Sequence, residues 1–315
     1  MSLSSEKIKA KAKESGFDFC GIAKAEPLTS QKEYNEDFVR KKLHLPFSYL
    51  ETNLEKRLDP LKIMPDASSV ITVLLNYYPD KIIPEEDNFI ISKYAYGNDY
   101  YTVVKKKMDE LIKFIISKNH PSPEGEGPGV RLAKALGFVD SGSVLEKVWA
   151  QRCGLGWQGK NTLLINKHAG SFFFIGIILT NLELEPDHPE TDHCGSCNKC
   201  LEACPTGALE QPYQLTISKC IAYHTIENTL SETQEIHGKT DRWIYGCDIC
   251  QDVCPWNKDI PPTKESAFKP NPRLLKMIKN DWEKLDEKTF EKIFKDSAVK
   301  RIGFEKMKKN IENAP

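Results

Sequence analysis

The alternation of hydrophobic and polar stretches divides the first part of the chain into helices and strands. Residues 4–15 begin with a serine and end before Gly16, an order typical of a helix with signals at both ends. Residues 17–23 and 70–78 are apolar and rich in β-branched side chains. We expect both to form strands, the second in the interior of a sheet.

Residues 98–119 show the clearest helical periodicity. Three adjacent lysines, 105–107, fall away from the apolar face. The face itself, which we expect to be buried, comprises Val104, Met108, Leu111 and Ile115. A loop rich in glycine and proline is predicted to follow at 121–129.

A second helix is predicted from near Ser143 to near Gly154. Its start carries the capping-box pattern, because Ser143 is followed three residues later by Glu146. In a capping box the two side chains satisfy backbone N–H groups in the first turn. We therefore expect Glu146 to serve the start of its own helix.

Two further strands are predicted at 162–165 and 171–180. In the second, Gly176 marks a bulge or a close backbone approach. The acidic, proline-broken residues 183–193 then form a boundary before the cysteines, and a helical tail is expected after Pro262. Helices interleaved with strands up to this boundary argue for an α/β domain.

Composition limits the class of protein. A chain of 315 residues is long enough for two domains, or for one large domain that carries a small one. The longest apolar run, 172–179, is far shorter than the roughly twenty residues needed to span a bilayer, so we expect no membrane partner. The net charge of −1 does not favour nucleic-acid binding by the whole chain, but residues 264–315 hold 14 Lys and Arg against 9 Asp and Glu.

Cysteine spacing is the most informative chemical pattern. Ten cysteines are present, and eight of them lie within residues 194–254. The first run, which starts at Cys194, reads C-x2-C-x2-C-x3-C-P, the ligand pattern of bacterial two-cluster ferredoxins. The second run starts at Cys247 and lacks its leading cysteine, because Ile244 stands at that position.

This pattern predicts how the ligands divide between two 4Fe-4S clusters. The cysteine before proline ligates the other cluster, and the isolated Cys220 is the natural substitute for the missing ligand. Cys20 and Cys153 are expected to be buried small hydrophobic residues. One predicted set is Cys194, Cys197, Cys200 and Cys254. The other predicted set is Cys204, Cys220, Cys247 and Cys250.

Zinc and disulfides explain the spacing less well. Structural zinc usually takes two ligand pairs separated by about a dozen residues or more, whereas the first run is continuous and ends in proline. Disulfides need an oxidising compartment, and the lysine-rich start of the chain has no apolar segment of a signal peptide. We therefore expect a cytoplasmic protein whose reduced thiols serve as thiolate ligands.

A cluster pair conducts electrons, so the large segment in front of it should hold an electron acceptor. No glycine pattern of the dinucleotide-binding or P-loop type is present. The glycine-rich residues 154–161 allow two interpretations: a helix C-cap that runs into a loop, or a bare backbone that a large flat ligand approaches between Trp157 and Lys160. Asp140, in a turn, is either a solvated residue or, if the turn faces a cavity, a buried proton donor.

Several segments together resemble the epoxyqueuosine reductase (QueG) family, enzymes that depend on cobalamin and iron–sulfur clusters and complete queuosine in tRNA. The resemblance extends from about residue 6 to about residue 312. The segments that carry it are 57–65 (RLDPLKIMP), 94–100 (YAYGNDY), 139–147 (VDSGSVLEK), 154–162 (GLGWQGKNT), 204–209 (CPTGAL), 220–227 (CIAYHTIE), 245–257 (YGCDICQDVCPWN) and 297–304 (SAVKRIGF).

The resemblance implies an α/β (α+β) fold in three parts. Residues 1–185 would form a nitroreductase-like, cobalamin-binding catalytic domain, residues 186–262 a ferredoxin-like domain with two 4Fe-4S clusters, and residues 263–315 a helical tail. Cobalamin would be bound base-off, since the Asp-x-His-x-x-Gly signature of histidine ligation is absent. The implied cobalamin contacts are Arg57, Tyr96, Asp140, Trp157, Gln158, Gly159, Lys160, Asn161 and Tyr223.

The resemblance also implies the reaction. Electrons from a small donor such as flavodoxin or ferredoxin would cross both clusters to cobalt. Low-valent cobalt would then take part in removing the epoxide oxygen of epoxyqueuosine at the wobble position of a tRNA anticodon stem-loop. Asp140 would be the catalytic proton donor, and the oxygen would leave as water. A monomer is the family expectation.

This chain departs from the family in two places. Tyr101 follows Asp99 and Tyr100 where many members have histidine, so no role falls to a histidine there. The C-terminal helical-repeat extension of many members is not part of these 315 residues, so some tRNA contacts would be absent or rebuilt. Basic runs are usually a solvated helix face. As a hypothesis, the residues that contact tRNA phosphates are Lys300, Arg301, Lys308 and Lys309.

Two other functions stay open from the sequence. A reductive dehalogenase would share cobalamin and two clusters, but those enzymes typically carry a twin-arginine export signal, which this sequence lacks. A plain electron-transfer ferredoxin would need only the clusters and would leave the first domain without a role.

Overall fold

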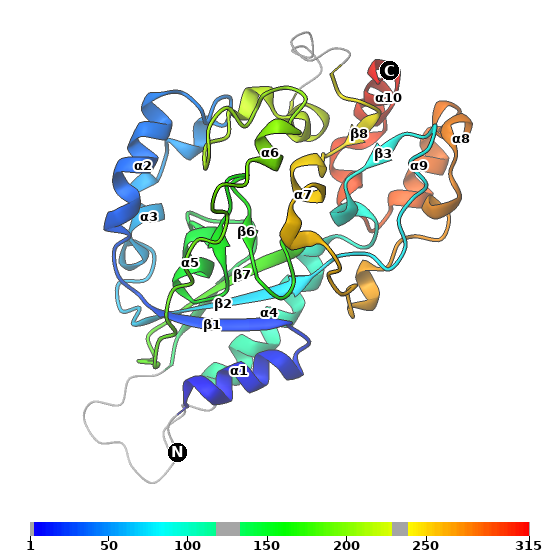
Figure 1. Ribbon diagram of the computed structural model, residues 1–315. Coiled ribbons are helices and arrows are strands. Elements are labelled where there is room, and N and C mark those ends of the chain that lie inside the picture. Colours follow the sequence, from blue (N-terminus) through cyan, green and yellow to red (C-terminus); the bar gives the residue numbers. More distant parts are fainter. Residues whose placement is uncertain (1–2, 118–132, 229–238, 315) are drawn as a thin grey trace, which may run out of the picture.

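A four-stranded antiparallel sheet forms the centre of the protein (Figure 1). The computed structural model describes residues 3–117, 133–228 and 239–314. The strands, in spatial order, are β1 (Phe19–Lys24), β2 (Ser69–Asn76), β7 (Phe173–Thr180) and β4 (Ala135–Phe138), and every neighbouring pair is antiparallel. The expected mixed α/β fold is therefore confirmed, with an antiparallel central sheet.

β2 is the interior strand that its sequence predicts. All of its residues are buried, because both faces of the sheet are covered. Ile71 packs with α1 (Ser5–Glu14) and α4 (Tyr100–Ser117), whereas its neighbour Val70 packs on the other face with α5 (Glu146–Arg152). This alternation follows from the two-residue period of a strand. The sheet thus separates α1 and α4 from α5 and the cysteine-rich segment (Figure 1).

α4 lies close against the sheet because β7 has a glycine beneath it. A Cβ atom at Gly176 would come within 2.4 Å of the Met108 sulfur. The ladder with β2 continues past this point, with Val73 opposite Gly176, so the glycine marks a close approach and not a bulge. The predicted buried face is confirmed as Val104, Met108, Leu111 and Ile115.

α5 differs from the predicted helix at its start. It begins at Glu146, three residues after Ser143, and no side chain caps it. Oε1 of Glu146 instead accepts the backbone N–H of Asp140 at 2.7 Å. The capping-box prediction is wrong, because this carboxylate serves the turn that precedes the helix.

The other predicted boundaries shift by a few residues. α1 begins after Ser4, whose side chain makes no capping hydrogen bond, and the chain leaves the helix at Gly16 with a φ of 88°. The predicted strand at 162–165 is shorter, β6 (Leu164–Ile165), and pairs with β5 (Trp157–Gln158). The loop predicted at 121–129 lies outside the described residues.

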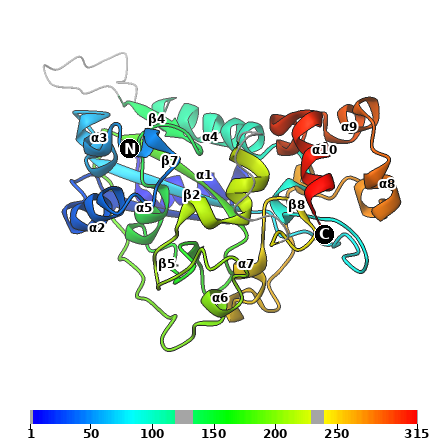
Figure 2. The same cartoon turned by 90° about the horizontal axis from the view of Figure 1, so that it is seen from above.

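Helices gather at the two ends of the sheet. α2 (Thr29–Arg40) and α3 (Leu54–Leu58) lie at one end (Figure 2). At the opposite end lie α8 (Lys279–Glu283), α9 (Glu287–Phe294) and α10 (Gly303–Asn313), which confirms the predicted helical tail.

The tail is joined to the rest of the protein by a small parallel pair of strands. β3 (Ile90–Ile91) pairs with β8 (Trp243–Tyr245), and both pack with the tail helices in one hydrophobic cluster. The cysteine-rich segment carries two short helices, α6 (Lys199–Glu202) and α7 (Ile249–Asp252), on the α5 side of the sheet (Figure 1). Within the described residues no helix has the length and apolar character that crossing a bilayer requires.

Candidate functional site

The first predicted cysteine set gathers around two short helices. Cys194 and Cys197 precede α6, and Cys200 lies within it, whereas Cys254 follows α7, which packs against α6. The thiol charges of Cys194 and Cys197 act on Cys254, and the charge of Cys254 acts on Cys200. The fold therefore brings these four cysteines together, although Cys254 is remote from the others in the sequence.

The second predicted set surrounds a cavity of about 300 Å³. Burial raises the pKa of the Cys250 thiol, and the charges of Cys247, Cys220 and Cys204 add to this effect. Ile244, at the position of the missing ligand, is fully buried in the hydrophobic cluster of the tail. Cys220 occupies the fourth place, since the cavity is lined by Cys204, Cys220, Cys247 and Cys250.

The surroundings of the first set fit an iron–sulfur cluster. All ten cysteines are free thiols, and across residues 3–117, 133–228 and 239–314 no three His, Cys, Asp or Glu side chains form a site for a single metal ion. The indole N–H of Trp157 is buried without a hydrogen-bond partner among the described residues. Burial raises the pKa of the adjacent Cys194 thiol, and this indole opposes the rise. The indole N–H therefore lies beside the Cys194 sulfur, where it would stabilise a thiolate that ligates a cluster.

The glycine-rich segment 154–162 lies between the two cysteine sets. Nζ of Lys160 donates to the carbonyl oxygen of Gly195 at 2.7 Å, which fastens the loop of the first set. Nδ2 of Asn161 donates to the carbonyl oxygen of Cys250 at 3.1 Å and so reaches the second set. The segment is therefore more than the end of a helix, because its side chains hold both cysteine loops.

The other predicted cobalamin contacts lie in different environments. Tyr96 is buried in the hydrophobic cluster of the tail, and Tyr223 packs edge-on against Phe47. Gln158 is half-buried in β5, and Gly159 is buried. The described hydrogen bonds and ion pairs join none of these four residues to Asp140.

Arg57 lies nearer to the predicted acid. Its guanidinium carbon is 5.9 Å from the centre of the Tyr49 ring, an exposed aromatic side chain. Its charge acts on Glu146, which accepts the Asp140 N–H. Nε of Arg57 is buried and has no hydrogen-bond partner in the described part of the chain.

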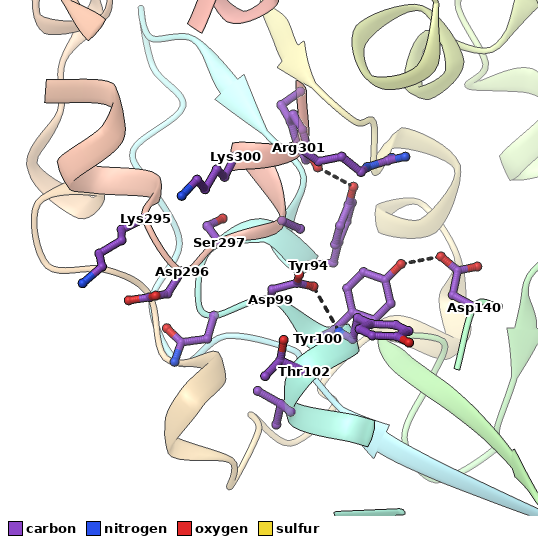
Figure 3. A pocket seen from close by; sticks show the side chains of 15 residues that line it. Tyr94, Asp99, Tyr100, Thr102, Asp140, Lys295, Asp296, Ser297, Lys300 and Arg301 are labelled. Carbon is purple, nitrogen blue, oxygen red and sulfur yellow. Dashed lines mark hydrogen bonds between the residues drawn. The ribbon is translucent and has the colours of Figure 1, made fainter. Parts of the chain in front are cut away.

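Asp140 opens onto a cavity of about 700 Å³ (Figure 3). It is exposed in the turn after β4, and its Oδ2 accepts a hydrogen bond from the Tyr100 hydroxyl. The cavity wall opposite carries basic side chains from the tail, among them Lys300 and Arg301 (Figure 3). The turn faces a cavity, but the side chain is exposed and not buried, and its role as proton donor stays a prediction.

Two ionisable neighbours of Asp140 respond to its charge. Burial and the Asp140 charge raise the pKa of Glu146 to about 7, while Lys147 and Arg57 oppose the rise. Burial and the same charge raise the pKa of the Tyr100 phenol well above its usual value. Tyr100 therefore stays a neutral donor to Asp140 at all ordinary pH values.

The two cavities adjoin at Tyr94. This side chain lines the Asp140 cavity and also the cavity of the second cysteine set, and its hydroxyl donates to that of Tyr245 at 3.1 Å. Lys147, which follows Glu146, lines the cysteine cavity and donates to the carbonyl oxygen of Thr162 at 2.8 Å. The Asp140 cavity and the cavity of the second cysteine set are therefore separated by one aromatic ring.

The chain is similar to one family of enzymes. The sequence model for epoxyqueuosine reductase QueG matches residues 57–141, and that for a 4Fe-4S double cluster binding domain matches residues 193–257. An epoxyqueuosine reductase of Cellulophaga algicola is 45% identical over 98% of this chain and 97% of its own length. The chain belongs to the epoxyqueuosine reductase family.

Solved epoxyqueuosine reductases have the same fold. One, crystallised with an epoxyqueuosine-modified stem loop of tyrosine tRNA, superposes with a TM-score of 0.85 at 29% identity and covers 98% of this chain and 80% of its own. Another, from Bacillus subtilis, has a TM-score of 0.83 at 28% identity with the same coverage, and in it the catalytic loop that bears an aspartate is swung out of the active site. Membership in this enzyme family overrides the dehalogenase and ferredoxin alternatives.

The two family models cover part of the residues that the sequence analysis selected. The QueG match contains Arg57 and Asp140, and the double-cluster match contains all eight ligand candidates. Sequence reasoning missed Tyr100 and Glu146 as partners of Asp140. Tyr100 belongs to a segment that carries the family resemblance, but no role was predicted for it, and Glu146 was assigned to a helix cap. Their contacts with Asp140 could not be predicted, because hydrogen bonds across a turn leave no periodic signal in the sequence.

Proposed function

We propose that this enzyme reduces epoxyqueuosine at the wobble position of tRNA to queuosine, the final step of queuosine biosynthesis, in the cytoplasm. The observation that carries the proposal is that the Asp140 cavity shares Tyr94 with the cavity of the second cysteine set. A proton donor and an electron source are thereby adjacent. The related enzyme crystallised with an epoxyqueuosine-modified stem loop supports the choice of substrate.

The electrons would pass through two 4Fe-4S clusters. The first would be held by Cys194, Cys197, Cys200 and Cys254, and the second by Cys204, Cys220, Cys247 and Cys250. A small donor such as flavodoxin or ferredoxin would reduce them. The second set lines the inner cavity, which supports its place as the last relay before the substrate site.

The residues between the second set and Asp140 fit cobalamin. Lys147 is accessible to solvent, yet it lies in a recess where burial lowers the pKa of its ammonium group. Together with the unpaired Nε of Arg57 and with Asn161, it would bind the amide side chains of the corrin. Bound base-off, the cofactor would supply low-valent cobalt, which takes part in removing the epoxide oxygen. Among the described residues no histidine lines either cavity, which supports the base-off form.

Asp140 would supply the proton for the departing oxygen. Its carboxyl group faces the cavity, and Tyr100 holds it in place from the side (Figure 3). Two electrons and two protons, one from Asp140 and one from solvent, would convert the epoxide to an alkene, and the oxygen would leave as water. The residues of this chain therefore orient the substrate and deliver the proton, while the clusters deliver the electrons.

The division of the chain is also proposed. Residues 1–185 would form a nitroreductase-like domain, residues 186–262 a ferredoxin-like domain, and residues 263–315 the tail, in a monomer. The pairing of β3 with β8 joins the first part to the second, so these parts would act as one body.

The proposal is tested with the purified protein, loaded with cobalamin and reduced with dithionite. An anticodon stem-loop that bears epoxyqueuosine is the substrate, and loss of one oxygen atom is followed by mass spectrometry. We expect conversion only when protein, cobalamin and reductant are all present. A stem-loop that is unchanged under these conditions would refute the proposed function.

Basic and aromatic side chains around the Asp140 cavity suit an RNA loop. Lys300 is exposed, and Arg301 forms a two-pronged ion pair with Glu227 at the same rim. Tyr49 and Tyr101, the exposed aromatic residues of the described chain, flank Asp140. Bases of single-stranded RNA commonly stack on such rings, and phosphates pair with such cations.

Charge reversal at the rim should therefore weaken tRNA binding. Lys300→Glu is expected to raise the Kd for the stem-loop about tenfold and to lower the slope of log Kd against log salt by about one. Lys113→Glu is the matched control, because this exposed lysine lies on α4 about 15 Å along the helix from the cavity. Equal affinities of the two variants in a salt titration would show that Lys300 makes no phosphate contact.

A further inference from the structure

Glu146 lies in the first turn of α5, but its side chain does not cap that helix. Its Oε1 accepts the backbone N–H of Asp140 at 2.7 Å, six residues back along the chain. The start of α5 receives no hydrogen bond from a capping side chain. The carboxylate is therefore committed to the turn that carries the acid.

That turn holds Asp140 in an unusual backbone conformation. Its φ is 45°, in the left-handed region that residues with a Cβ atom rarely adopt. Such a conformation persists only where the surroundings determine it. The hydrogen bond from the Asp140 N–H to Glu146 is a contact that does so.

Asp140 is thus held at both ends. Glu146 holds its backbone, and the Tyr100 hydroxyl holds its carboxylate, as Figure 3 shows for the second contact. Tyr100 is itself fixed, because its ring stacks on Phe174 of β7 with centroids 4.4 Å apart. One support is anchored in the sheet and the other in α5, so the acid is positioned by two separate elements.

We propose that Glu146 is the positioning residue of the catalytic acid: its carboxylate clamps the Asp140 turn so that the Asp140 carboxyl faces the substrate cavity. The inference rests on the proposed function for its kinetic consequences, but the clamp is a property of the turn itself. In the Bacillus subtilis relative the catalytic loop that bears an aspartate is swung out of the active site.

The clamp is also electrostatically coupled to the acid. The charged groups that face Glu146 are Asp140, Lys147 and Arg57. Burial and the Asp140 charge raise the pKa of Glu146 to about 7, so Glu146 is neutral below this pH and ionised above it. Removing the Glu146 carboxyl removes this titration.

Two substitutions separate the clamp from the charge. Glu146→Gln keeps an oxygen that accepts the Asp140 N–H, whereas Glu146→Ala removes it. For the alanine variant we expect kcat to fall about 10- to 100-fold, because the Asp140 carboxyl is no longer held in position. The KM for the stem-loop should stay within about twofold of wild type, because substrate binding is unchanged. For the glutamine variant we expect kcat at acidic pH within about threefold of wild type.

The pH profile of the glutamine variant is the readout that a merely structural role would not move. In wild type Glu146 loses its proton at about pH 7, whereas a glutamine at this position does not titrate. The step in kcat near pH 7 that wild type shows should therefore be absent in Glu146→Gln. A step near pH 7 that persists in the variant would overturn the coupling of Glu146 to the acid.

Hydrogen exchange tests the clamp without turnover. In the holoenzyme, amides of residues 139–142 should exchange about tenfold faster in Glu146→Ala than in wild type, and at the wild-type rate in Glu146→Gln. Cluster absorbance checks that both variants are folded, and Glu6→Ala, in the first turn of α1, is the control that should change nothing. Wild-type exchange and wild-type kcat in Glu146→Ala would overturn the inference. Absence of turnover in the wild-type enzyme would refute the proposed function instead. The hydrogen-exchange rates of residues 139–142 would still test whether Glu146 holds the turn.

Discussion

Replacement of Asp140 by asparagine is expected to lower kcat for epoxyqueuosine reduction about 10²- to 10⁴-fold, the usual contribution of a positioned general acid. Asparagine has the same shape. Its side-chain oxygen still accepts the Tyr100 hydroxyl, and its backbone N–H still reaches Glu146. Only the proton that can be donated is lost, so binding of the stem-loop should be unchanged.

Single-turnover rates measure this effect, with iron and cobalamin content determined on the same sample. Asp87→Asn is a matched control, because Asp87 is also exposed and has a φ of 49°, close to the 45° of Asp140. The control should keep the wild-type rate. If Asp140→Asn kept it as well, another group would supply the proton and the acid assignment would be wrong.

The features that the sequence predicts best are those with a local period. The buried face of α4 follows from the spacing of Val104 to Ile115, and the burial of β2 follows from its continuous apolar run. The cysteine sets are equally readable, because a cluster imposes short, fixed ligand spacing on each run. Even Cys220 could be assigned, since one ligand was missing and one cysteine was left over.

The features that the sequence hides are long-range hydrogen bonds. Lys160 and Asn161 lie in a glycine-rich segment that suggests a ligand loop, yet their side chains fasten two cysteine loops that come later in the chain. Likewise Glu146 fits a capping box so well that its contact with Asp140 has no separate signal. In each case the local pattern is real, but tertiary contacts decide how the side chain is used.

The placement of Tyr96 shows the limit of residue-by-residue transfer. Its segment, 94–100, supplies Tyr94 and Tyr100 to the two cavities, while Tyr96 between them turns into the core of the tail. Lys93 Nζ, next to this segment, donates to Asp252 of α7 at 2.8 Å. One short stretch therefore joins the Asp140 cavity, the tail and the cysteine helices.

Replacement of Cys220 by alanine is expected to remove the second cluster and with it all turnover. Iron content should fall from about eight to about four atoms per chain, because a 4Fe-4S cluster needs four thiolates. Cys220 lines the inner cavity together with Cys204, Cys247 and Cys250. Loss of this relay isolates the substrate site from the donor, so dithionite should no longer support reduction, while the first cluster and stem-loop affinity persist.

Cys153→Ala is the control that makes this result specific. Cys153 is buried behind β2, and its sulfur lies 3.3 Å from Oγ1 of Thr72. Burial raises the pKa of its thiol to about 12, so Cys153 is a neutral core side chain. The Cys153→Ala variant should therefore keep about eight iron atoms per chain and full turnover.

Full iron content in Cys220→Ala would mean that another residue completes the second cluster. Loss of iron in the Cys153 variant would instead refute the division of the ten cysteines into eight ligands and two core residues. Because both substitutions remove one sulfur atom, any difference between them reports the place of the cysteine and not the loss of a thiol.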